Sequence, residues 1–157
     1  MTTTPLLFAS RSYIYLRDAL LPLLAAERGD VDVQTFPDGE RYQRITSEIA
    51  GRACALVAGT ISDSDTLEAF DLACALVKYG CGELTLVIPF YGYSTMERAV
   101  KLGEVVTAKT RARLLSAIPE PPGGIRVMLV DLHAEGIPHY FEGPIRPAHV
   151  YCKSVIT

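Results

Sequence analysis

Positive charge is not in excess in this sequence of 157 residues. Its 15 Lys and Arg residues are outnumbered by 18 Asp and Glu residues, so the formal net charge is −3. Nucleic acids and anionic membranes are usually bound by surfaces rich in basic side chains. The charge balance therefore argues against both kinds of partner.

Cysteine is scarce, and its spacing does not indicate a metal site. The four cysteines form no Cys-X-X-Cys pair and no Cys/His spacing typical of zinc; they are Cys54, Cys74, Cys81 and Cys152. Cys54 and Cys74 lie within apolar patterns, which favours reduced, buried thiols in a cytosolic protein.

Long apolar runs are also absent. No stretch reaches the roughly 20 apolar residues of a membrane-spanning helix. The first four residues, Met-Thr-Thr-Thr, lack the basic and apolar parts of a signal peptide. We therefore expect a soluble, cytoplasmic protein, long enough for one domain that buries its core without metals or disulfides.

Short apolar runs alternate with segments of helical periodicity, which is typical of an α/β protein with a mostly parallel sheet flanked by helices. Runs that indicate strands occur at 6–9, 53–58, 84–88 and 125–130. The first helix is expected to start near Tyr13 and to break near Leu21, because Pro22 lacks a backbone donor. The apolar stripes of the other two helices are Leu67, Phe70, Cys74 and Val77, and Ala108, Ala112, Leu115 and Ile118.

Polar residues in front of the three helices predict how each one begins. A serine of segment 10–12 is expected to cap the first helix, and Thr107 to cap the third. Segment 61–65 supplies several possible caps for the second helix, and Asp65 with Glu68 three residues later resembles a capping box. Gly80 should end this helix.

Segments 31–36 and 41–45 alternate apolar and polar residues, as strands with one face in solvent do. The four residues between them, Pro-Asp-Gly-Glu, have the composition of a turn. The sequence therefore predicts a short antiparallel hairpin attached to the main sheet.

Polar loops follow two of the predicted strands. Strand 84–88 leads to a charged loop that reaches Lys109, and strand 125–130 leads to the polar segment 131–135. Ligands of open α/β sheets bind beyond the carboxyl ends of the strands. We expect the two loops to converge there, with the chemistry of the chain near residues 89–109.

The last segment, residues 137–157, contains three prolines and no completed periodic element. We predict that residues 1–157 form one domain and that residues 144–157 begin a connection to a second domain outside this sequence.

Three motifs occur in a fixed order along the chain. They are Phe-Pro-Asp-Gly-Glu at 36–40, Ile-Pro-Phe-Tyr-Gly-Tyr at 88–93 with Thr-Ala-Lys at 107–109, and Val-Asp-Leu-His-Ala-Glu at 130–135. Their order and spacing resemble those of the ribose-phosphate pyrophosphokinases, also called phosphoribosyl pyrophosphate synthetases. Because the three motifs span about 100 residues, they are more specific together than any one alone. The whole chain resembles the N-terminal domain of this family.

The resemblance implies one half of a tandem of two phosphoribosyltransferase-like α/β domains. Enzymes of the family transfer a diphosphoryl group from magnesium ATP to the 1-hydroxyl of ribose 5-phosphate, which gives phosphoribosyl pyrophosphate and AMP. ATP, Mg²⁺ and ribose 5-phosphate are thus the implied ligands, and a homo-oligomer is the implied assembly. The acidic, glycine-rich loop that holds ribose phosphate in the family's C-terminal domain does not occur in these 157 residues, so this sequence alone is expected to be inactive.

The resemblance also implies nucleotide-binding residues. Phe36, Asp38 and Glu40 match a hairpin that forms part of the adenine pocket, often across a subunit interface. In such a pocket an aromatic ring stacks on the base and a carboxylate accepts a hydrogen bond from the exocyclic amine.

His133 matches a metal position of the family. Magnesium prefers oxygen ligands, so the residue types alone would favour Asp131 or Glu135 over this histidine. The resemblance nevertheless implies His133 as the metal residue, and no catalytic residue is assigned.

The sequence departs from the family pattern after the central motif. Ser94-Thr95-Met96-Glu97 replaces the usual Ala-Arg-Gln-Asp, so the arginine that serves the nucleotide is missing. Losing such a charge-assisted contact costs about 1.5–3 kcal/mol. Arg98 is the candidate to replace it. Val105 also stands where the family commonly has proline.

Two other functions stay open. The chain fits a non-catalytic, synthetase-associated regulatory paralogue, which the residues at 94–97 favour, or a generic α/β ligand-binding module.

Tyr91 and Tyr93 are interpreted as structural rings around a tight backbone at Gly92. His139 and His149 match no motif and are interpreted as surface or interface residues.

Overall fold

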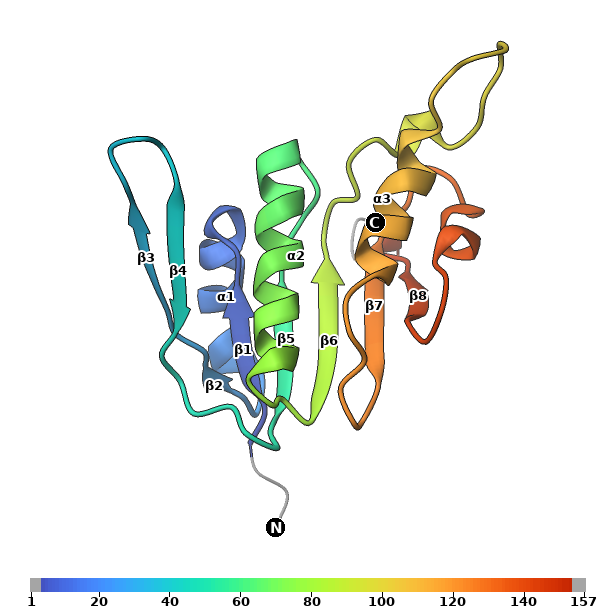
Figure 1. Ribbon diagram of the computed structural model, residues 1–157. Helices are drawn as coiled ribbons and strands as arrows, with labels where there is room; N and C mark the ends of the chain where they lie inside the picture. Colours follow the sequence, from blue (N-terminus) through green and yellow to red (C-terminus); the bar gives the residue numbers. More distant parts are fainter. Residues whose placement is uncertain (1–3, 154–157) are drawn as a thin grey trace.

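The computed structural model of the protein describes residues 4–153. Its main sheet has six strands, all parallel, in the order β2-β1-β5-β6-β7-β8 (Figure 1). The strands are β1 (Leu6–Ala9), β2 (Glu27–Arg28), β5 (Ala53–Val57), β6 (Glu83–Ile88), β7 (Ile125–Val130) and β8 (Arg146–Val150). The four strands predicted from apolar runs are confirmed, and they lie next to one another in the sheet.

Helices cover both faces of this sheet (Figure 1). Helices α2 (Asp63–Lys78) and α3 (Thr107–Ser116) pack on one face, over fully buried side chains such as Leu56, Leu86 and Val127. Helix α1 (Ile14–Leu20) covers the other face near β1, and Pro22 lies in the short 3-10 helix Leu21–Leu23 that follows it. The predicted break near Leu21 is thus confirmed.

The stripe predicted for α2 is confirmed in part, since Phe70, Cys74 and Val77 are partly buried against the core, but they lie at its margin. Leu67 is 54% exposed, whereas the buried apolar residues of the helix are Ala69, Leu72, Ala73 and Leu76. Two of these are alanines, whose small side chains let the helix approach the sheet closely and carry little weight in a hydrophobic pattern. The stripe predicted for α3 is confirmed, since Ala108, Ala112, Leu115 and Ile118 are all buried.

The cap of α2 lies in the predicted segment 61–65, whereas the caps expected for the first and third helices are wrong. Ser62 caps α2, since its Oγ accepts a hydrogen bond from the backbone N–H of Asp65 at 3.1 Å. Thr107 is the first residue of α3 and makes no capping bond. Ser10 also makes none, and the hydroxyl of Ser12 instead donates to Asp65. Glu68, predicted to complete a capping box, is buried in a contact with the hairpin.

The predicted antiparallel hairpin consists of β3 (Val31–Thr35) and β4 (Arg41–Ile45). It forms a separate two-stranded sheet beside the main one, rather than a part of it. Only its base packs against the core, through Val31 and Ile45. The expectation of one solvated face is confirmed for β4, whose residues alternate between half-buried and exposed. It is wrong for β3 beyond Val31, because Val33 is exposed as well.

The prediction that residues 137–157 contain no completed element is wrong. Strand β8 pairs in parallel with β7 from Arg126↔Arg146 to Val130↔Val150 and forms an edge of the main sheet. An edge strand tolerates Pro147, whose missing N–H need not face a neighbouring strand. Residues 154–157 of the predicted connection lie outside the described part of the chain.

The four cysteines are free thiols. Cys54 and Cys81 are buried, while Cys74 and Cys152 are partly exposed, so the prediction of buried thiols holds for half of them. Between residues 4 and 153, no helix combines the length and the apolar character needed to cross a membrane.

Replacing Ser62 with alanine should lower the free energy of unfolding by about 0.5–2 kcal/mol, because the first turn of α2 loses its cap. Thr107→Ala is the matched control and should change stability by less than about 0.5 kcal/mol. Urea unfolding followed by circular dichroism measures both changes. Equal losses in the two variants would contradict the assignment of Ser62 as the cap.

Candidate functional site

A cleft of about 440 Å³ opens at the carboxyl ends of β6 and β7. One wall is the loop after β6 and the other is the loop after β7; the lining residues are Pro89, Phe90, Tyr91, Tyr93, Ser94, Thr95, Val130, Asp131, Leu132 and His133. The predicted convergence of the two polar loops is therefore confirmed.

Tyr91 anchors the loop after β6. Its ring is buried, and its hydroxyl donates a hydrogen bond to the backbone carbonyl of Ala108, at the start of α3, at 2.8 Å. Burial raises the pKa of Tyr91, so the hydroxyl keeps its proton at neutral pH and remains a donor. The structural role predicted for this tyrosine is confirmed.

Gly92 allows a close approach of two backbone segments. Its N–H donates to Oγ1 of Thr60 at 2.7 Å, just after the end of β5. A Cβ atom on Gly92 would lie 1.9 Å from the carbonyl oxygen of Thr60, so no other residue fits without a backbone shift. The predicted tight backbone is thus confirmed.

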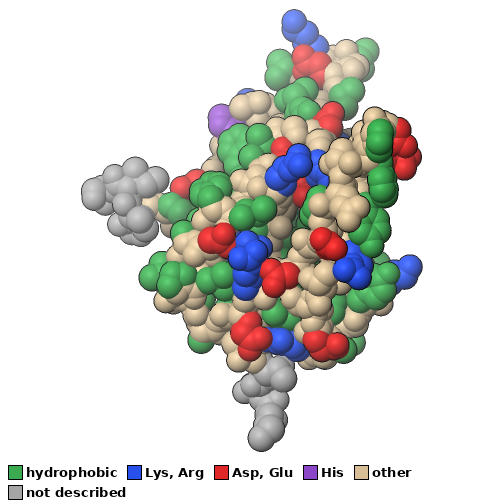
Figure 2. Space-filling model, turned by 90° about the vertical axis from the view of Figure 1, so that its left-hand side faces the viewer, with side chains coloured by type: hydrophobic (Ala, Val, Ile, Leu, Met, Phe, Trp, Pro, Cys, Tyr) green, Lys and Arg blue, Asp and Glu red, His purple; other side chains and the backbone are tan. Residues whose placement is uncertain are grey.

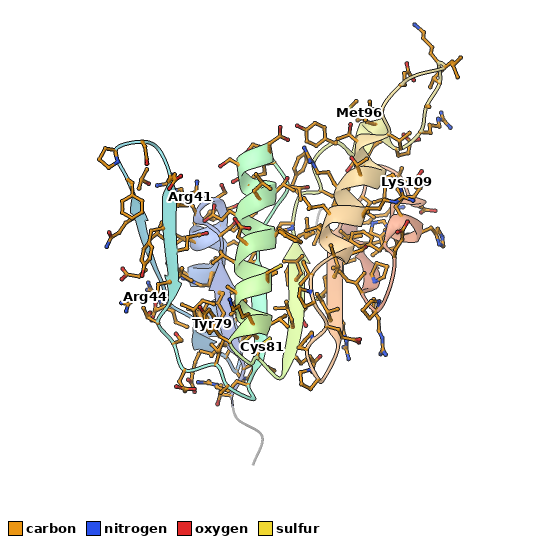
Figure 3. The ribbon with its side chains drawn as sticks, in the orientation of Figure 1. Arg41, Arg44, Tyr79, Cys81, Met96 and Lys109 are labelled. Carbon is orange, nitrogen blue, oxygen red and sulfur yellow. The ribbon has the colours of Figure 1, made fainter. Side chains whose placement is uncertain are left out.

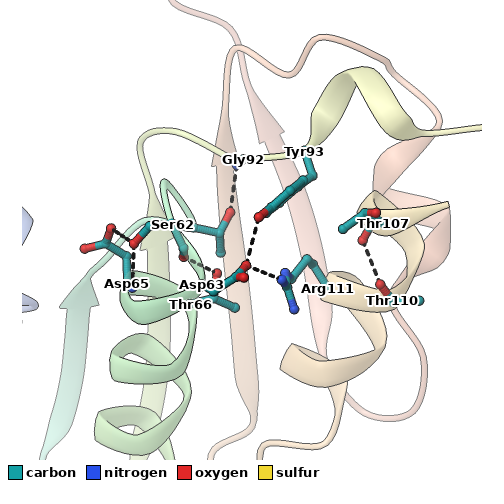
Figure 4. A network of polar contacts seen from close by, with 10 residues as sticks. Ser62, Asp63, Asp65, Thr66, Gly92, Tyr93, Thr107, Thr110 and Arg111 are labelled. Carbon is teal, nitrogen blue, oxygen red and sulfur yellow. Dashed lines mark hydrogen bonds and ion pairs between the residues drawn. The ribbon is translucent and has the colours of Figure 1, made fainter. Parts of the chain in front are cut away.

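Tyr93 connects this loop to two helices (Figure 4). Its hydroxyl donates to Oδ1 of Asp63 at 2.8 Å, and the guanidinium of Arg111 pairs with the same carboxylate. The guanidinium also lies 5.1 Å from the centre of the Tyr93 ring. Because Asp63 comes from the first turn of α2 and Arg111 from α3, one carboxylate fixes the loop to both helices. Nothing in the sequence pattern predicted this group.

The loop after β7 is shaped by β8. Asp131 has a positive φ of 42°, and its Oδ1 accepts a hydrogen bond from the backbone N–H of Cys152 at 2.9 Å. The backbone N–H of Leu132 donates to Nε2 of His149 at 3.0 Å. His149, interpreted from sequence as a surface or interface residue, therefore supports the segment that presents His133.

The predicted site residues fall into two separate places. His133 is exposed and lines the cleft. Phe36, Asp38 and Glu40 lie at the tip of the hairpin and do not line it; in Figure 3, α2 stands between the hairpin and the loops of the cleft. Within one chain, the structure does not bring these two groups together.

Arg98 does not reach the cleft. Its side chain is 78% exposed, and its nearest charged partner is Glu97 at 3.5 Å. It belongs to the segment between the turn Ser94–Met96 and α3, which projects from the domain in Figure 1. Ser94 and Thr95 line the cleft in this region instead.

The hairpin tip is a tight turn. The backbone N–H of Phe36 donates to the carbonyl of Glu40 at 2.8 Å, and that of Gly39 donates to the carbonyl of Phe36 at 2.9 Å. Oδ1 of Asp38 accepts from the N–H of Glu40 at 3.0 Å. Phe36 is 45% exposed, and its ring lies 6.3 Å from that of Tyr42 on the neighbouring strand.

The face that carries the hairpin has no broad patch of one charge. Acidic and basic side chains alternate over it in Figure 2. Two of the ion pairs near the hairpin are Arg28–Asp30 at 2.7 Å and Arg44–Asp32 at 3.2 Å. This face thus fits the acidic net charge of the chain.

The described residues do not build a protein-only metal centre. Over residues 4–153 there is no group of three or more His, Cys, Asp or Glu side chains that could hold an ion. Asp131 and His133 share the cleft, and one oxygen of Asp131 is already engaged by Cys152. Magnesium usually binds one or two carboxylates together with waters and substrate phosphates. These residues therefore fit an ion held mainly by phosphate.

The structure is that of an α/β domain with a cleft at the carboxyl edge of a parallel sheet, the edge at which ligands of such folds bind. Comparison with known proteins is more specific. The family model for the N-terminal domain of ribose phosphate pyrophosphokinase matches residues 6–118. The chain belongs to this family.

Relatives and a solved structure agree with this assignment. The ribose-phosphate pyrophosphokinase of Buchnera aphidicola subsp. Schizaphis graminum is 34% identical over 142 residues, which cover 88% of this chain and 44% of that protein. The ribose-phosphate pyrophosphokinase of Methanothermobacter thermautotrophicus is 33% identical over 117 residues, or 74% of this chain and 40% of that protein. The chain thus spans less than half the length of these relatives.

The fold matches the crystal structure of phosphoribosylpyrophosphate synthetase from Mycobacterium smegmatis with a TM-score of 0.84 and 23% identity. The match covers 98% of this chain and 50% of that one. The predicted fold class is confirmed, with its mostly parallel sheet flanked by helices and its short antiparallel hairpin.

Gly92→Ala should destabilise the protein by about 1–3 kcal/mol, because the added methyl group forces the loop away from Thr60. Gly136→Ala is the control, since a Cβ there meets nothing within 4 Å. Urea unfolding gives the stability of both variants. If Gly92→Ala proved as stable as Gly136→Ala, the close packing of the loop on β5 would be refuted.

Proposed function

We propose that this chain is the ATP-binding half of a ribose-phosphate pyrophosphokinase. In this function, diphosphate passes from magnesium ATP to the 1-hydroxyl of ribose 5-phosphate, giving phosphoribosyl pyrophosphate and AMP. Membership of the family supports the reaction class. Because the chain spans less than half of its relatives, ribose 5-phosphate is proposed to bind mainly to residues beyond this sequence.

One observation carries the nucleotide proposal: an exposed aromatic residue and two acidic residues belong to the same hydrogen-bonded turn at the hairpin tip. The ring of Phe36 offers a face on which a purine can stack, and Asp38 or Glu40 can accept hydrogen bonds from the exocyclic amine of adenine. Because the turn is held by its own hydrogen bonds, little order has to be gained on binding.

The hairpin and the cleft are separate within one chain, and this separation supports a homo-oligomer. In the proposed function the hairpin binds the base, and the cleft, with His133 and Asp131, serves the phosphates and magnesium. One chain keeps these two parts on opposite sides of α2 (Figure 3). A complete site is therefore proposed to combine the cleft of one subunit with the hairpin of another.

The cleft favours binding and positioning over covalent chemistry. Phosphoryl transfer depends on alignment of the reactants and on neutralising charge on the phosphate oxygens. Mg²⁺ bound mainly by ATP phosphates supplies that positive charge, and Asp131 and His133 are the residues proposed to contact the ion.

Free thiols at all four cysteines accord with a reducing, cytoplasmic location.

A second candidate is a regulatory paralogue that assembles with active subunits. It is favoured by Thr95 at the place of the nucleotide arginine and by Arg98, which points to solvent rather than into the cleft. In this alternative the chain binds nucleotide but completes no transfer.

Phe36→Ala should weaken binding of magnesium ATP to the assembled protein by roughly 5- to 150-fold, because loss of one aromatic stack on a base costs about 1–3 kcal/mol. Isothermal titration calorimetry measures the affinity. Tyr79→Ala is the matched control, because Tyr79 is also an exposed aromatic residue but lies at the far end of α2 (Figure 3).

His133→Ala should weaken ATP binding in the presence of Mg²⁺ and leave metal-free ATP binding unchanged. An intact oligomer that binds no ATP with magnesium would contradict the proposal and favour a generic α/β binding module. If the full-length protein binds ATP but does not convert ribose 5-phosphate, the regulatory paralogue is favoured.

A further inference from the structure

The hairpin has few supports of its own. The backbones of strands β3 and β4 pair only with each other, and an isolated two-stranded sheet is marginally stable in water. Val31 and Ile45 hold its base against the core, but Val33 and Phe36 farther up are exposed. Another contact must therefore set the position of the upper half.

Glu68 supplies such a contact from α2. Its side chain is only 4% exposed, and one carboxylate oxygen pairs with Nη1 of Arg41 at 2.6 Å. The other oxygen accepts hydrogen bonds from Nε2 of Gln43 and from the backbone N–H of Arg11, each at 3.2 Å. One buried carboxylate thus joins α2, strand β4 and the segment after β1.

These contacts lie near the tip of the hairpin. Arg41 is the first residue of β4, pairs with Thr35 and directly follows the turn 36–40. Gln43, two residues on, points to the same face of the strand. In Figure 3, Arg41 stands between the hairpin and α2. The carboxylate of Glu68 therefore contacts the hairpin next to the turn 36–40, which is proposed to bind nucleotide, rather than at the base of the hairpin.

The other ion pair of the hairpin cannot do this. Asp32 and Arg44 are both largely exposed and belong to β3 and β4, so their contact links the hairpin only to itself. Exposed pairs of this kind contribute little, whereas a buried and fully hydrogen-bonded pair selects one geometry.

We propose that Glu68 is a positioning residue that fixes the hairpin tip, and with it Phe36, Asp38 and Glu40, relative to the sheet. Its role in nucleotide binding rests on the proposed function, whereas its control of the hairpin does not.

The sequence has no tryptophan, so Phe36→Trp places a single tryptophan at the hairpin tip. In this background Glu68→Leu removes all three contacts, and Glu68→Gln keeps an acceptor for Arg11 and Gln43 while losing the charge opposite Arg41. We expect the tryptophan anisotropy to fall in the order parent, Glu68→Gln, Glu68→Leu. Asp32→Asn, which breaks the exposed pair, should leave the anisotropy at the parent value.

Thermal unfolding by circular dichroism establishes which variants fold. Unchanged anisotropy in folded Glu68→Gln and Glu68→Leu would overturn the proposal. Failure of both variants to fold would also overturn it, because Glu68 would then support the whole domain rather than the position of the hairpin.

Nucleotide affinity separates this proposal from the proposed function. In the assembled protein with native Phe36, Glu68→Leu should raise the Kd for magnesium ATP about 10-fold if the competent hairpin position falls to about a tenth of the population. A fall in anisotropy with unchanged affinity would keep Glu68 as the positioning residue and refute the role of the hairpin in binding ATP.

Discussion

The hydrogen bond between the backbone N–H of Gly92 and the hydroxyl of Thr60 is the contact on which the carboxyl edge of the sheet depends. It brings the loop after β6 against the end of β5, next to the start of α2. Only from that position can Tyr93 reach the carboxylate of Asp63, which Arg111 also contacts. The wall of the cleft is therefore set by a backbone approach that glycine permits, and is then locked by one shared carboxylate.

The proposed nucleotide site has two parts that are held by different physical means. The cleft is formed by loops that leave neighbouring strands of one sheet, so its shape follows from the pairing of β6 with β7. The hairpin is outside that sheet, and a buried carboxylate, Glu68, sets its upper half. In an oligomer, the precision of the combined site would depend on both supports, because either part can be displaced without disturbing the other.

Strands of the sheet centre and the hairpin were predictable because short apolar runs and alternating patterns are local signals. The individual caps and the centre of the α2 stripe were not, since several polar residues competed for each cap and the buried surface of α2 is made partly of alanine. Strand β8 escaped prediction because Pro147 and polar residues conceal an edge strand that only pairing with β7 reveals. At the site, the position of His133 followed from its strand, whereas Arg98 lies in a loop whose direction no local pattern describes.

By itself the sequence determined the order of the four central strands, the hairpin and the three helices, the edge at which polar loops meet, and the motifs that mark the family. The tertiary structure decided which residues support those loops and the hairpin. Asp63 pairs with Arg111, His149 accepts a hydrogen bond from the N–H of Leu132, and Glu68 contacts the hairpin. Periodicity and turn composition act between near neighbours, but Arg111 and Asp63 are 48 residues apart in the chain. Their meeting depends on how the two helices pack on the sheet, which only the folded chain defines.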